Sequence, residues 1–190
     1  MKGLLTLFIV CFSLHSKAET VDFSFGIGAS HFNNKLEKYD HDSRDIGLVA
    51  DINYYPFNYN LKHGEINFGL GLGYIKFGKF NASFSTEGQT EHDKLIAESL
   101  TPGYGFSALL ATKYAYNNSF LEFSIGKFYW HNDTLINDKD YNKKGDSAIY
   151  GAEVGYMIAD RIGLSLSVDT SKYKGNRSTL YSIKIHYTLI

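Results

Sequence analysis

Eight ionisable side chains sit in segments that otherwise alternate between apolar and small polar residues. Each of them falls on the parity opposite the apolar residues, so in extended strands they would share one face. Carboxylates, ammonium groups and an imidazole on a shared inner face can pair with one another or line a path for ions. A buried charge that did neither would be costly. The eight are Asp22, Asp51, Lys113, Glu122, Glu153, Asp169, Lys184 and His186.

The alternation is clearest between residues 147 and 173. Two runs there place apolar residues on one parity and mostly Gly and Ser on the other, with a predicted three-residue turn at Ala159-Asp160-Arg161. Period two indicates extended strands, and the short turn joins them as an antiparallel hairpin. Each run has about the 9–11 residues of a tilted membrane-crossing strand. The small polar face favours the cramped interior of a narrow barrel whose outside meets lipid.

Six further segments carry the same pattern, which gives eight strands in all. Pro56 should end the second strand, because proline cannot donate to the ladder, and residues 57–64 should form a turn. Long connections at 33–43, 78–100 and 131–146 alternate with short ones, as in outer-membrane barrels. The sequence therefore predicts an all-β, eight-stranded antiparallel up-and-down transmembrane barrel. The other predicted strands are 21–32, 44–56, 65–77, 101–116, 120–130 and 178–189.

Aromatic residues gather near the predicted strand ends, where membrane barrels carry interfacial girdles. A soluble barrel of the lipocalin kind would turn its apolar face inward and its charges outward. Glycine opposite the apolar face favours the membrane barrel, because it would make room inside for the charged chains. The predicted girdle residues are Tyr54, Tyr55, Phe57, Tyr114, Tyr116 and Phe120 at the short-turn end, and Phe128, Tyr129 and Trp130 at the loop end.

Residues 1–18 have the pattern of a cleaved secretory signal. Lys2 starts it, an apolar stretch covers residues 3–14, and Ser16-Lys17-Ala18 offers a cleavage site. An anchor helix would need a longer apolar run, and Val10 replaces the small residue that a lipoprotein has before a cysteine such as Cys11. We therefore expect one barrel domain at residues 19–190, in a Gram-negative outer membrane.

Cleavage after residue 18 would remove Cys11, the only cysteine, so the mature chain would contain no disulfide. It would keep 17 Lys and Arg against 20 Asp and Glu, a formal charge of −3. No basic patch in the sequence argues for a nucleic-acid partner.

Residues 126–134 resemble the exit of the fifth strand of the OmpA transmembrane domain, with its Gly-x-x-x-Trp-x-x-Asp-Thr pattern. Residues 151–156, Gly-Ala-Glu-Val-Gly-Tyr, are similar to the sixth strand of that family. The eight-strand count extends a looser resemblance over residues 21–190 and is shared with OmpX and Ail-like barrels. Two departures are the missing peptidoglycan-binding domain and the terminal Ile190, where the insertion signal usually has an aromatic residue. Because of the terminal Ile190, we expect recognition by the barrel-assembly machinery to be less efficient.

Two roles are open for the inner charges. They can form a structural ion-pair network that holds the lumen shut, with Lys184 and Asp169 as the expected pair. The OmpA resemblance implies the alternative, a narrow gated ion channel. We expect the first, in a non-enzymatic surface barrel that contributes to envelope integrity and offers its outer loops for adhesion. The expected partners are membrane lipids, lipopolysaccharide phosphates and a host or surface ligand, and the barrel is expected to be a monomer.

Some eight-stranded barrels modify lipid A, so enzymes of that kind must be weighed. The deacylase type has a His-x-Ser pair, whereas residues 168–171 here contain no histidine. The palmitoyl-transfer type uses His, Asp and Ser near the outer rim, and His31, Asp133 and Ser30 could be so arranged. Most barrels with polar loops offer such a trio, and its members must share hydrogen-bond reach. We therefore predict no catalytic residue and no cofactor.

Histidine stands beside acids at residues 40–42, 91–93 and 131–133, in three predicted outer loops. None of these spacings fits a fixed coordination geometry, so solvated loop charge is expected and no metal site is predicted.

Overall fold

The computed structural model describes residues 20–33, 40–83, 100–132, 134–136 and 139–189. The predicted signal segment and the loop triad at residues 91–93 lie outside this described part of the chain. Within it, no helix is long and apolar enough to cross a membrane, a finding that does not bear on crossing by strands.

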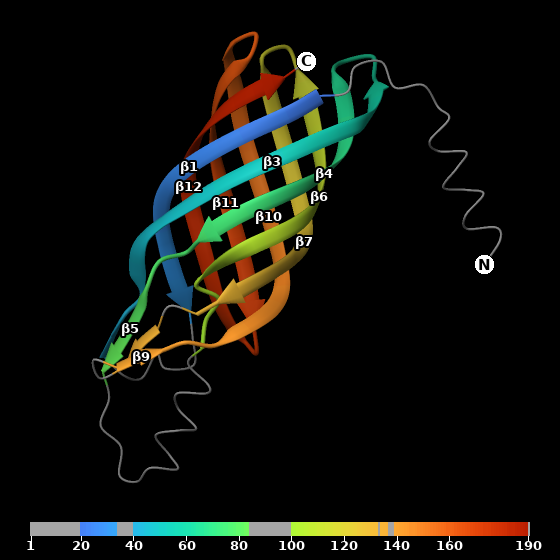
Figure 1. The fold of residues 1–190 in the computed structure, drawn as a ribbon. Coiled ribbons are helices and arrows are strands. Elements are labelled where there is room, and N and C mark those ends of the chain that lie inside the picture. Colours follow the sequence, from blue (N-terminus) through green and yellow to red (C-terminus); the bar gives the residue numbers. More distant parts are fainter. Residues whose placement is uncertain (1–19, 34–39, 84–99, 133, 137–138, 190) are drawn as a thin grey trace, which may run out of the picture.

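Eight long strands form a closed barrel (Figure 1). Neighbours along the chain pair antiparallel, and β1 pairs with β12 to close the ring, so the predicted eight-stranded up-and-down barrel is confirmed. Closure leaves the barrel without an unpaired edge. The strands are β1 Thr20–Asn33, β3 Arg44–Asn60, β4 Glu65–Lys76, β6 Tyr104–Tyr116, β7 Ser119–His131, β10 Lys144–Ala159, β11 Ile162–Tyr173 and β12 Asn176–Leu189.

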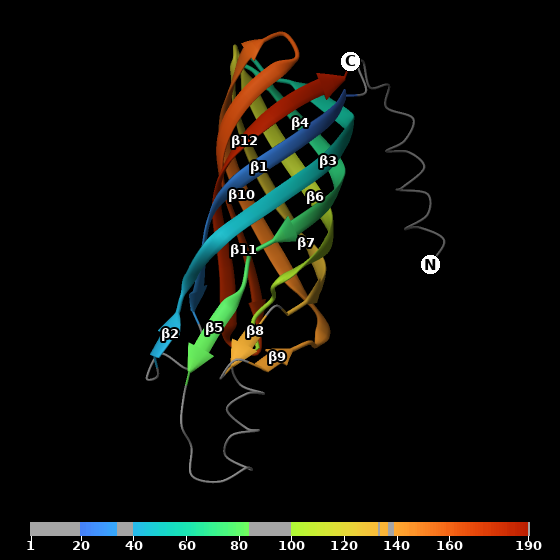
Figure 2. The ribbon, with the colours of Figure 1, turned by 60° about the vertical axis from the view of Figure 1, so that its left-hand side comes forward.

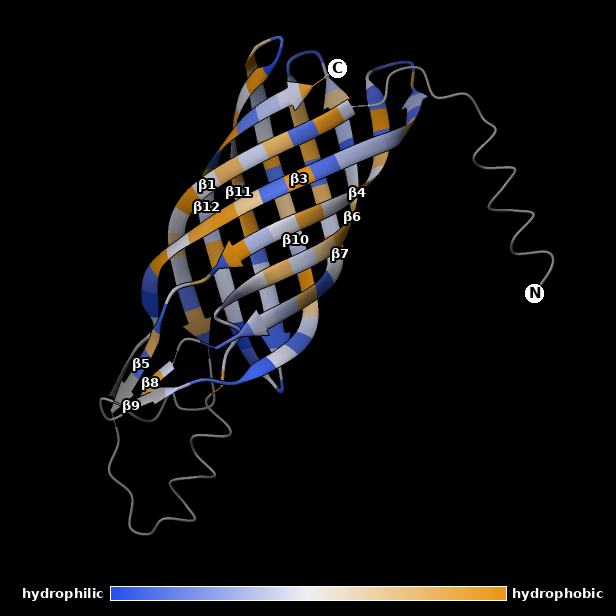
Figure 3. Ribbon diagram, in the orientation of Figure 1, coloured by the Kyte–Doolittle hydropathy of each residue, from blue (hydrophilic) through white to orange (hydrophobic). Residues whose placement is uncertain are grey.

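The outer face of the barrel is apolar. Large hydrophobic side chains on all eight strands are exposed, such as Leu72 and Phe106, each at 68%. Polar and apolar residues alternate along the strands in Figure 3, which is the consequence of period two. An apolar surface of this extent is unfavourable in water, so the barrel presents it to lipid.

Strand β3 does not end at Pro56 as predicted. It continues to Asn60, and its register with β4 shifts between Tyr54 and Phe57. This irregularity takes Pro56 out of the ladder, so the missing amide hydrogen costs no pairing. The predicted turn at residues 57–64 is therefore wrong over its first half. The β10–β11 turn is also shorter than predicted, because Ala159 pairs with Ile162 and a second irregularity lies between Met157 and Ala159.

A second, smaller sheet lies beyond the loop end of the barrel (Figure 2). Its four short strands lie in the three long connections, where the alternation did not predict a second sheet. The central pair, β5 and β8, runs parallel and joins two connections that are far apart in the sequence. The strands are β2 Asp40–Asp42, β5 Phe80–Ser83, β8 Thr134–Ile136 and β9 Lys139–Tyr141.

The lumen is packed with apolar side chains near the loop end. Trp130 packs edge-on against Tyr173 with ring centroids 4.8 Å apart, and Phe77 packs against Phe128 at 5.8 Å. We call this cluster the apolar plug. The small polar face predicted for residues 147–173 therefore does not describe the whole interior, because the inward side chains at this end are large and apolar. The plug consists of Phe32, Val49, Ile75, Phe77, Phe80, Phe128, Trp130, Ile149 and Leu180.

Several predicted girdle residues point into the barrel instead. Tyr55, Phe120, Phe128 and Trp130 are each at most 3% exposed. The girdle prediction is wrong for these four, because adjacent residues of a strand face opposite sides. The predicted girdle residues Tyr54, Tyr114, Tyr116 and Tyr129 do lie on the exposed outer face.

Residues 100–103 run into the mouth of the barrel beside the plug, and all four are buried. Asn176 Nδ2 donates a hydrogen bond to the Leu100 carbonyl at 2.8 Å, and Ser178 Oγ donates to that of Pro102 at 2.7 Å. The end of the longest connection is therefore fixed to the inner wall of β12.

Candidate functional site: the charged lumen

The eight predicted ionisable residues all lie inside the barrel, distributed over seven of its eight strands. Seven of them are buried, and the Lys113 side chain is 11% exposed. Glycine on the same face gives them space, since a Cβ at Gly73 would collide with Asp51 Oδ1 and Ser107 Oγ. They divide into three clusters along the barrel.

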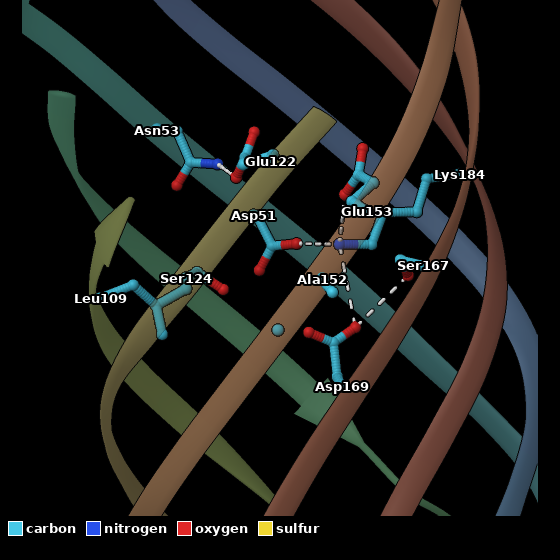
Figure 4. A pocket seen from close by; sticks show the side chains of 11 residues that line it. Asp51, Asn53, Leu109, Glu122, Ser124, Ala152, Glu153, Ser167, Asp169 and Lys184 are labelled. Carbon is cyan, nitrogen blue, oxygen red and sulfur yellow. Dashed lines mark hydrogen bonds and ion pairs between the residues drawn. The ribbon is translucent and has the colours of Figure 1, made fainter. Parts of the chain in front are cut away.

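Lys184 is the centre of the largest cluster (Figure 4). Its Nζ lies 2.8 Å from Asp51 Oδ2, 3.1 Å from Glu153 Oε2 and 3.9 Å from Asp169 Oδ2. Asp51 on β3 and Glu153 on β10 are each two strands away from β12, on opposite sides of it. Lys184 therefore reaches across both neighbouring strands, and its contact with Asp169 on adjacent β11 is the longest of the three. The energetic coupling of Lys184 with Asp169 stays a prediction.

His186 extends this cluster toward the short turns. Its Nε2 lies 2.6 Å from Glu153 Oε1 and 2.8 Å from Ser165 Oγ, and the Phe120 ring packs edge-on against its imidazole. In a hydrolytic relay the acid and the nucleophile bind opposite ring nitrogens. Here both contact the same nitrogen, so Ser165, His186 and Glu153 do not have the geometry of a catalytic triad.

Glu122 forms a second cluster with uncharged donors. Its carboxylate accepts hydrogen bonds from Tyr55 Oη at 2.7 Å and from Asn53 Nδ2 at 3.0 Å. Among the described residues no Lys, Arg or His forms an ion pair with it. Tyr55 and Asn53 were not among the predicted site residues, yet they share the parity of Asp51. Extending that parity along the strand would have found both.

Asp22 and Lys113 form the third cluster, nearest the short turns. Lys113 Nζ lies 2.6 Å from Asp22 Oδ2 and 4.4 Å from the Phe120 ring centroid, and Thr188 Oγ1 donates to Asp22 at 2.7 Å. This cluster forms the floor of an open vestibule of about 300 Å³ at the short-turn mouth.

The lumen narrows sharply beyond this vestibule. The space between Lys184, Glu122 and Asp169 is about 10 Å³, which is about the minimum for a single water molecule. The apolar plug follows it toward the loops. The lumen is therefore open and polar at the short-turn end, nearly filled in the middle, and closed by apolar side chains at the loop end.

The other candidate residues from the sequence do not come together. Ser30 is buried and its hydroxyl donates to the Asp45 carbonyl at 3.0 Å, whereas His31 is exposed on the opposite face of β1. Asp133 lies outside the described residues. Within the described ranges, no three His, Cys, Asp or Glu side chains are placed to hold a metal ion.

No protein-family model and no curated protein matches the chain. Solved structures do. The attachment invasion locus protein Ail of Yersinia pestis, in complex with the heparin analogue sucrose octasulfate, superposes with a TM-score of 0.54 at 13% identity, covering 91% of this chain and 100% of that one. A second Ail crystal structure gives a TM-score of 0.52 at 13% identity over the same shares. Neisserial surface protein A gives 0.47 at 9% identity, covering 90% of this chain and 99% of that one.

Identity this low establishes the fold alone. That fold, together with the outward apolar face, defines the class: a small eight-stranded β-barrel of the outer membrane. Its eight-stranded fold is similar to that of Ail.

Proposed function

We propose that the protein is a non-conducting, non-enzymatic surface barrel that acts through the connections at its plugged end. The observation that carries this proposal is the filling of the lumen. Phe77, Phe128 and Trp130 are at most 2% exposed, and residues 100–103 are bonded to the wall beside them. A lumen packed in this way favours a structural role for the barrel over the conduction of solutes.

In this proposal the inner charges are structural. Each of the three clusters satisfies its carboxylates with ammonium, imidazole, hydroxyl or amide donors. Such pairing offsets the cost of burying charge, and it fixes the strands relative to one another across the barrel. The two contacts of Lys184 across its neighbouring strands are the strongest support for this role.

The small sheet at the loop end is the surface that we propose for recognition. Ail, which has the same fold, is named for attachment and invasion and was crystallised with a heparin analogue. By analogy we propose an adhesion-type role for this barrel, with a host or surface ligand bound by its connections. We further propose that it works as a monomer, inserted by the barrel-assembly machinery and surrounded by lipopolysaccharide.

Conductance of the refolded barrel in a planar bilayer tests the proposal. We expect no current from the wild-type protein or from Glu153→Ala, because the plug lies beyond that residue. Lys127→Gln is the matched control, since Lys127 lies on the outer face and pairs with Asp146. A wild-type current that Glu153→Ala changes would overturn the proposal and assign the inner charges to a gate.

One observation favours this second candidate, a narrow gated channel. The vestibule opens the short-turn end as far as Asp22 and Lys113, so part of the route for an ion is already present. Under this alternative the plug would have to move aside, and Trp130→Ala should then increase the current.

A further inference from the structure

The seam between β1 and β12 differs from the other strand pairings of the barrel (Figure 1). Each of the others joins strands that are neighbours along the chain, so a connection holds the two strands together at one end. The seam joins the first strand to the last, and the chain does not connect them directly. Local opening of a fold is easiest where the fewest constraints act. Side chains that cross the seam are therefore expected to matter most for keeping the barrel closed.

Lys184 of β12 is a side chain that crosses this seam. Its direct partner on β1 is Gly26, and its ammonium passes over that residue to Asp51 Oδ2 on β3, at 2.8 Å (Figure 4). Glycine leaves this passage open, because a Cβ at Gly26 would lie 2.6 Å from Lys184 Cγ. The contact of Lys184 with Glu153, at 3.1 Å, does not cross the seam, since β10, β11 and β12 are consecutive strands.

The seam also separates two groups of inner charges. The first four strands carry Asp22, Asp51 and Lys113, and the last four carry the other five ionisable residues. Lys113 pairs with Asp22, whereas Asp51 receives only a hydrogen bond within its own group, from Ser24 Oγ at 3.3 Å. Among the described residues, Lys184 is the one cation that forms ion pairs with carboxylates of both groups. The first group therefore obtains the cation for Asp51 from across the seam.

We propose that Lys184, Gly26 and Asp51 form a seam latch that holds β1 against β12 in the closed barrel. When the two strands separate, Lys184 keeps Glu153 as a partner, but Asp51 is left without a cation. A buried carboxylate in that state is costly, so the latch adds a penalty for opening to the loss of the backbone ladder. Gly26 is the positioning residue of the latch. The device goes beyond the proposed surface role, because it would act equally in a structural barrel and in a channel.

Two further side-chain contacts cross the seam, and neither supplies a cation to an acid. Thr188 Oγ1 of β12 donates a hydrogen bond to Asp22 Oδ1 at 2.7 Å, but Asp22 already pairs with Lys113. Leu180 of β12 reaches β3, where a Cβ at Gly47 would lie 2.5 Å from its Cδ1. That contact is apolar and belongs to the plug. Opening of the seam would thus leave an unmatched charge at Asp51.

Hydrogen exchange of the backbone amides tests the latch, measured by mass spectrometry on the full chain in phosphatidylcholine nanodiscs. Asp51→Asn and Glu153→Gln are a matched pair. Each removes the charge of a carboxylate that contacts Lys184, and only the first of these contacts crosses the seam. We expect Asp51→Asn to accelerate exchange in β1 and β12 by about tenfold or more. Glu153→Gln should leave exchange in β1 unchanged.

Gly26→Ala tests the passage over β1 with every charge retained. Its methyl group should displace the Lys184 side chain and accelerate exchange at the seam. The same methyl group would also approach the Ile183 carbonyl, at 2.8 Å, so the double variant G26A/D51N is needed. If Gly26 acts through the latch, G26A/D51N exchanges no faster at the seam than Gly26→Ala alone. Where Gly26→Ala does not fold, the Asp51 and Glu153 variants decide the outcome.

Three results would overturn the proposal. They are unchanged seam exchange in Asp51→Asn, equal acceleration of β1 by Asp51→Asn and Glu153→Gln, and additive effects in G26A/D51N. The conductance experiment does not depend on these exchange rates, so a failure of the proposed function is distinguishable from a failure of the latch.

Discussion

The loop-end half of the lumen is filled by apolar packing, whereas the half facing the short turns is organised by charge. Both halves are built on the same eight strands with the same alternation. In and against the apolar plug, aromatic rings pack edge to face and exclude water. In the charged half, five carboxylates share two ammonium groups, one imidazole and several uncharged donors. Alternation thus decides which residues face inward, and it leaves open how the interior is filled.

The difference indicates a division of labour. A charged interior tolerates water and holds strands together through specific contacts, and it is intolerant of losing a single partner. An apolar plug closes the barrel by volume, and it tolerates a change of chemistry better than a change of size. The following substitutions test whether the two halves behave so differently.

Lys184→Met should have the largest effect, a loss of about 4 kcal/mol of unfolding free energy. It removes the cation shared by Asp51, Glu153 and Asp169 and leaves their carboxylates facing one another. Urea titration of the barrel in phospholipid vesicles measures the loss. Lys127→Met, on the exposed outer face, is the control and should leave the midpoint unchanged. Equal midpoints for the two variants would show that the charged half is not organised around Lys184.

The same urea titration measures the energetic coupling between Lys184 and Asp169. Asp169→Asn is measured alone and together with Lys184→Met, and we expect the two effects to be non-additive by about 1 kcal/mol or more. Strict additivity would mean that the 3.9 Å contact contributes nothing.

Phe128→Ala should cost about 3 kcal/mol, through the cavity that it leaves in the plug. Its control is Phe106→Ala, which removes the same ring from the outer face, where lipid can fill the space. The titration should show a clearly smaller loss for the control. Similar losses for both rings would mean that the plug is packed no more tightly than the lipid boundary.

Tyr55→Phe should cost about 2 kcal/mol, because Glu122 would lose a hydrogen bond donor while remaining buried. Tyr181→Phe removes the same hydroxyl from the exposed outer face of β12 and should change the midpoint very little. If the two variants behave alike, Tyr55 does not support the Glu122 carboxylate.

Ser178→Ala should have the smallest effect, about 1 kcal/mol, since it deletes one hydrogen bond to the Pro102 carbonyl. Ser119→Ala, at an exposed position at the opposite end, is the matched control. A loss as large as that of Phe128→Ala would indicate that residues 100–103, rather than the aromatic rings, hold the loop end closed.

The sequence was sufficient to predict the barrel because period two is a local property of each strand. It also placed the eight ionisable residues on the inward parity. It did not predict the two shortest contacts of Lys184, with Asp51 and Glu153, because those reach strands that are two places away in the barrel. Tyr55, Phe120 and Trp130 were assigned to the girdle from their position along the chain, although counting parity from Asp51 or Glu122 places them inside. The small sheet could not be predicted because its β5–β8 pairing joins separate connections over only three residue pairs.

Trp130 is the single tryptophan of the chain and lies in the plug with an exposed fraction of 2%. The indole emission of the whole protein therefore originates at one place, the closed mouth of the barrel. Its wavelength depends on contact with water, so any opening of that mouth shifts the emission to the red. The molecule thus contains its own optical sensor of the plug, and opening of the plug can be followed there without a label.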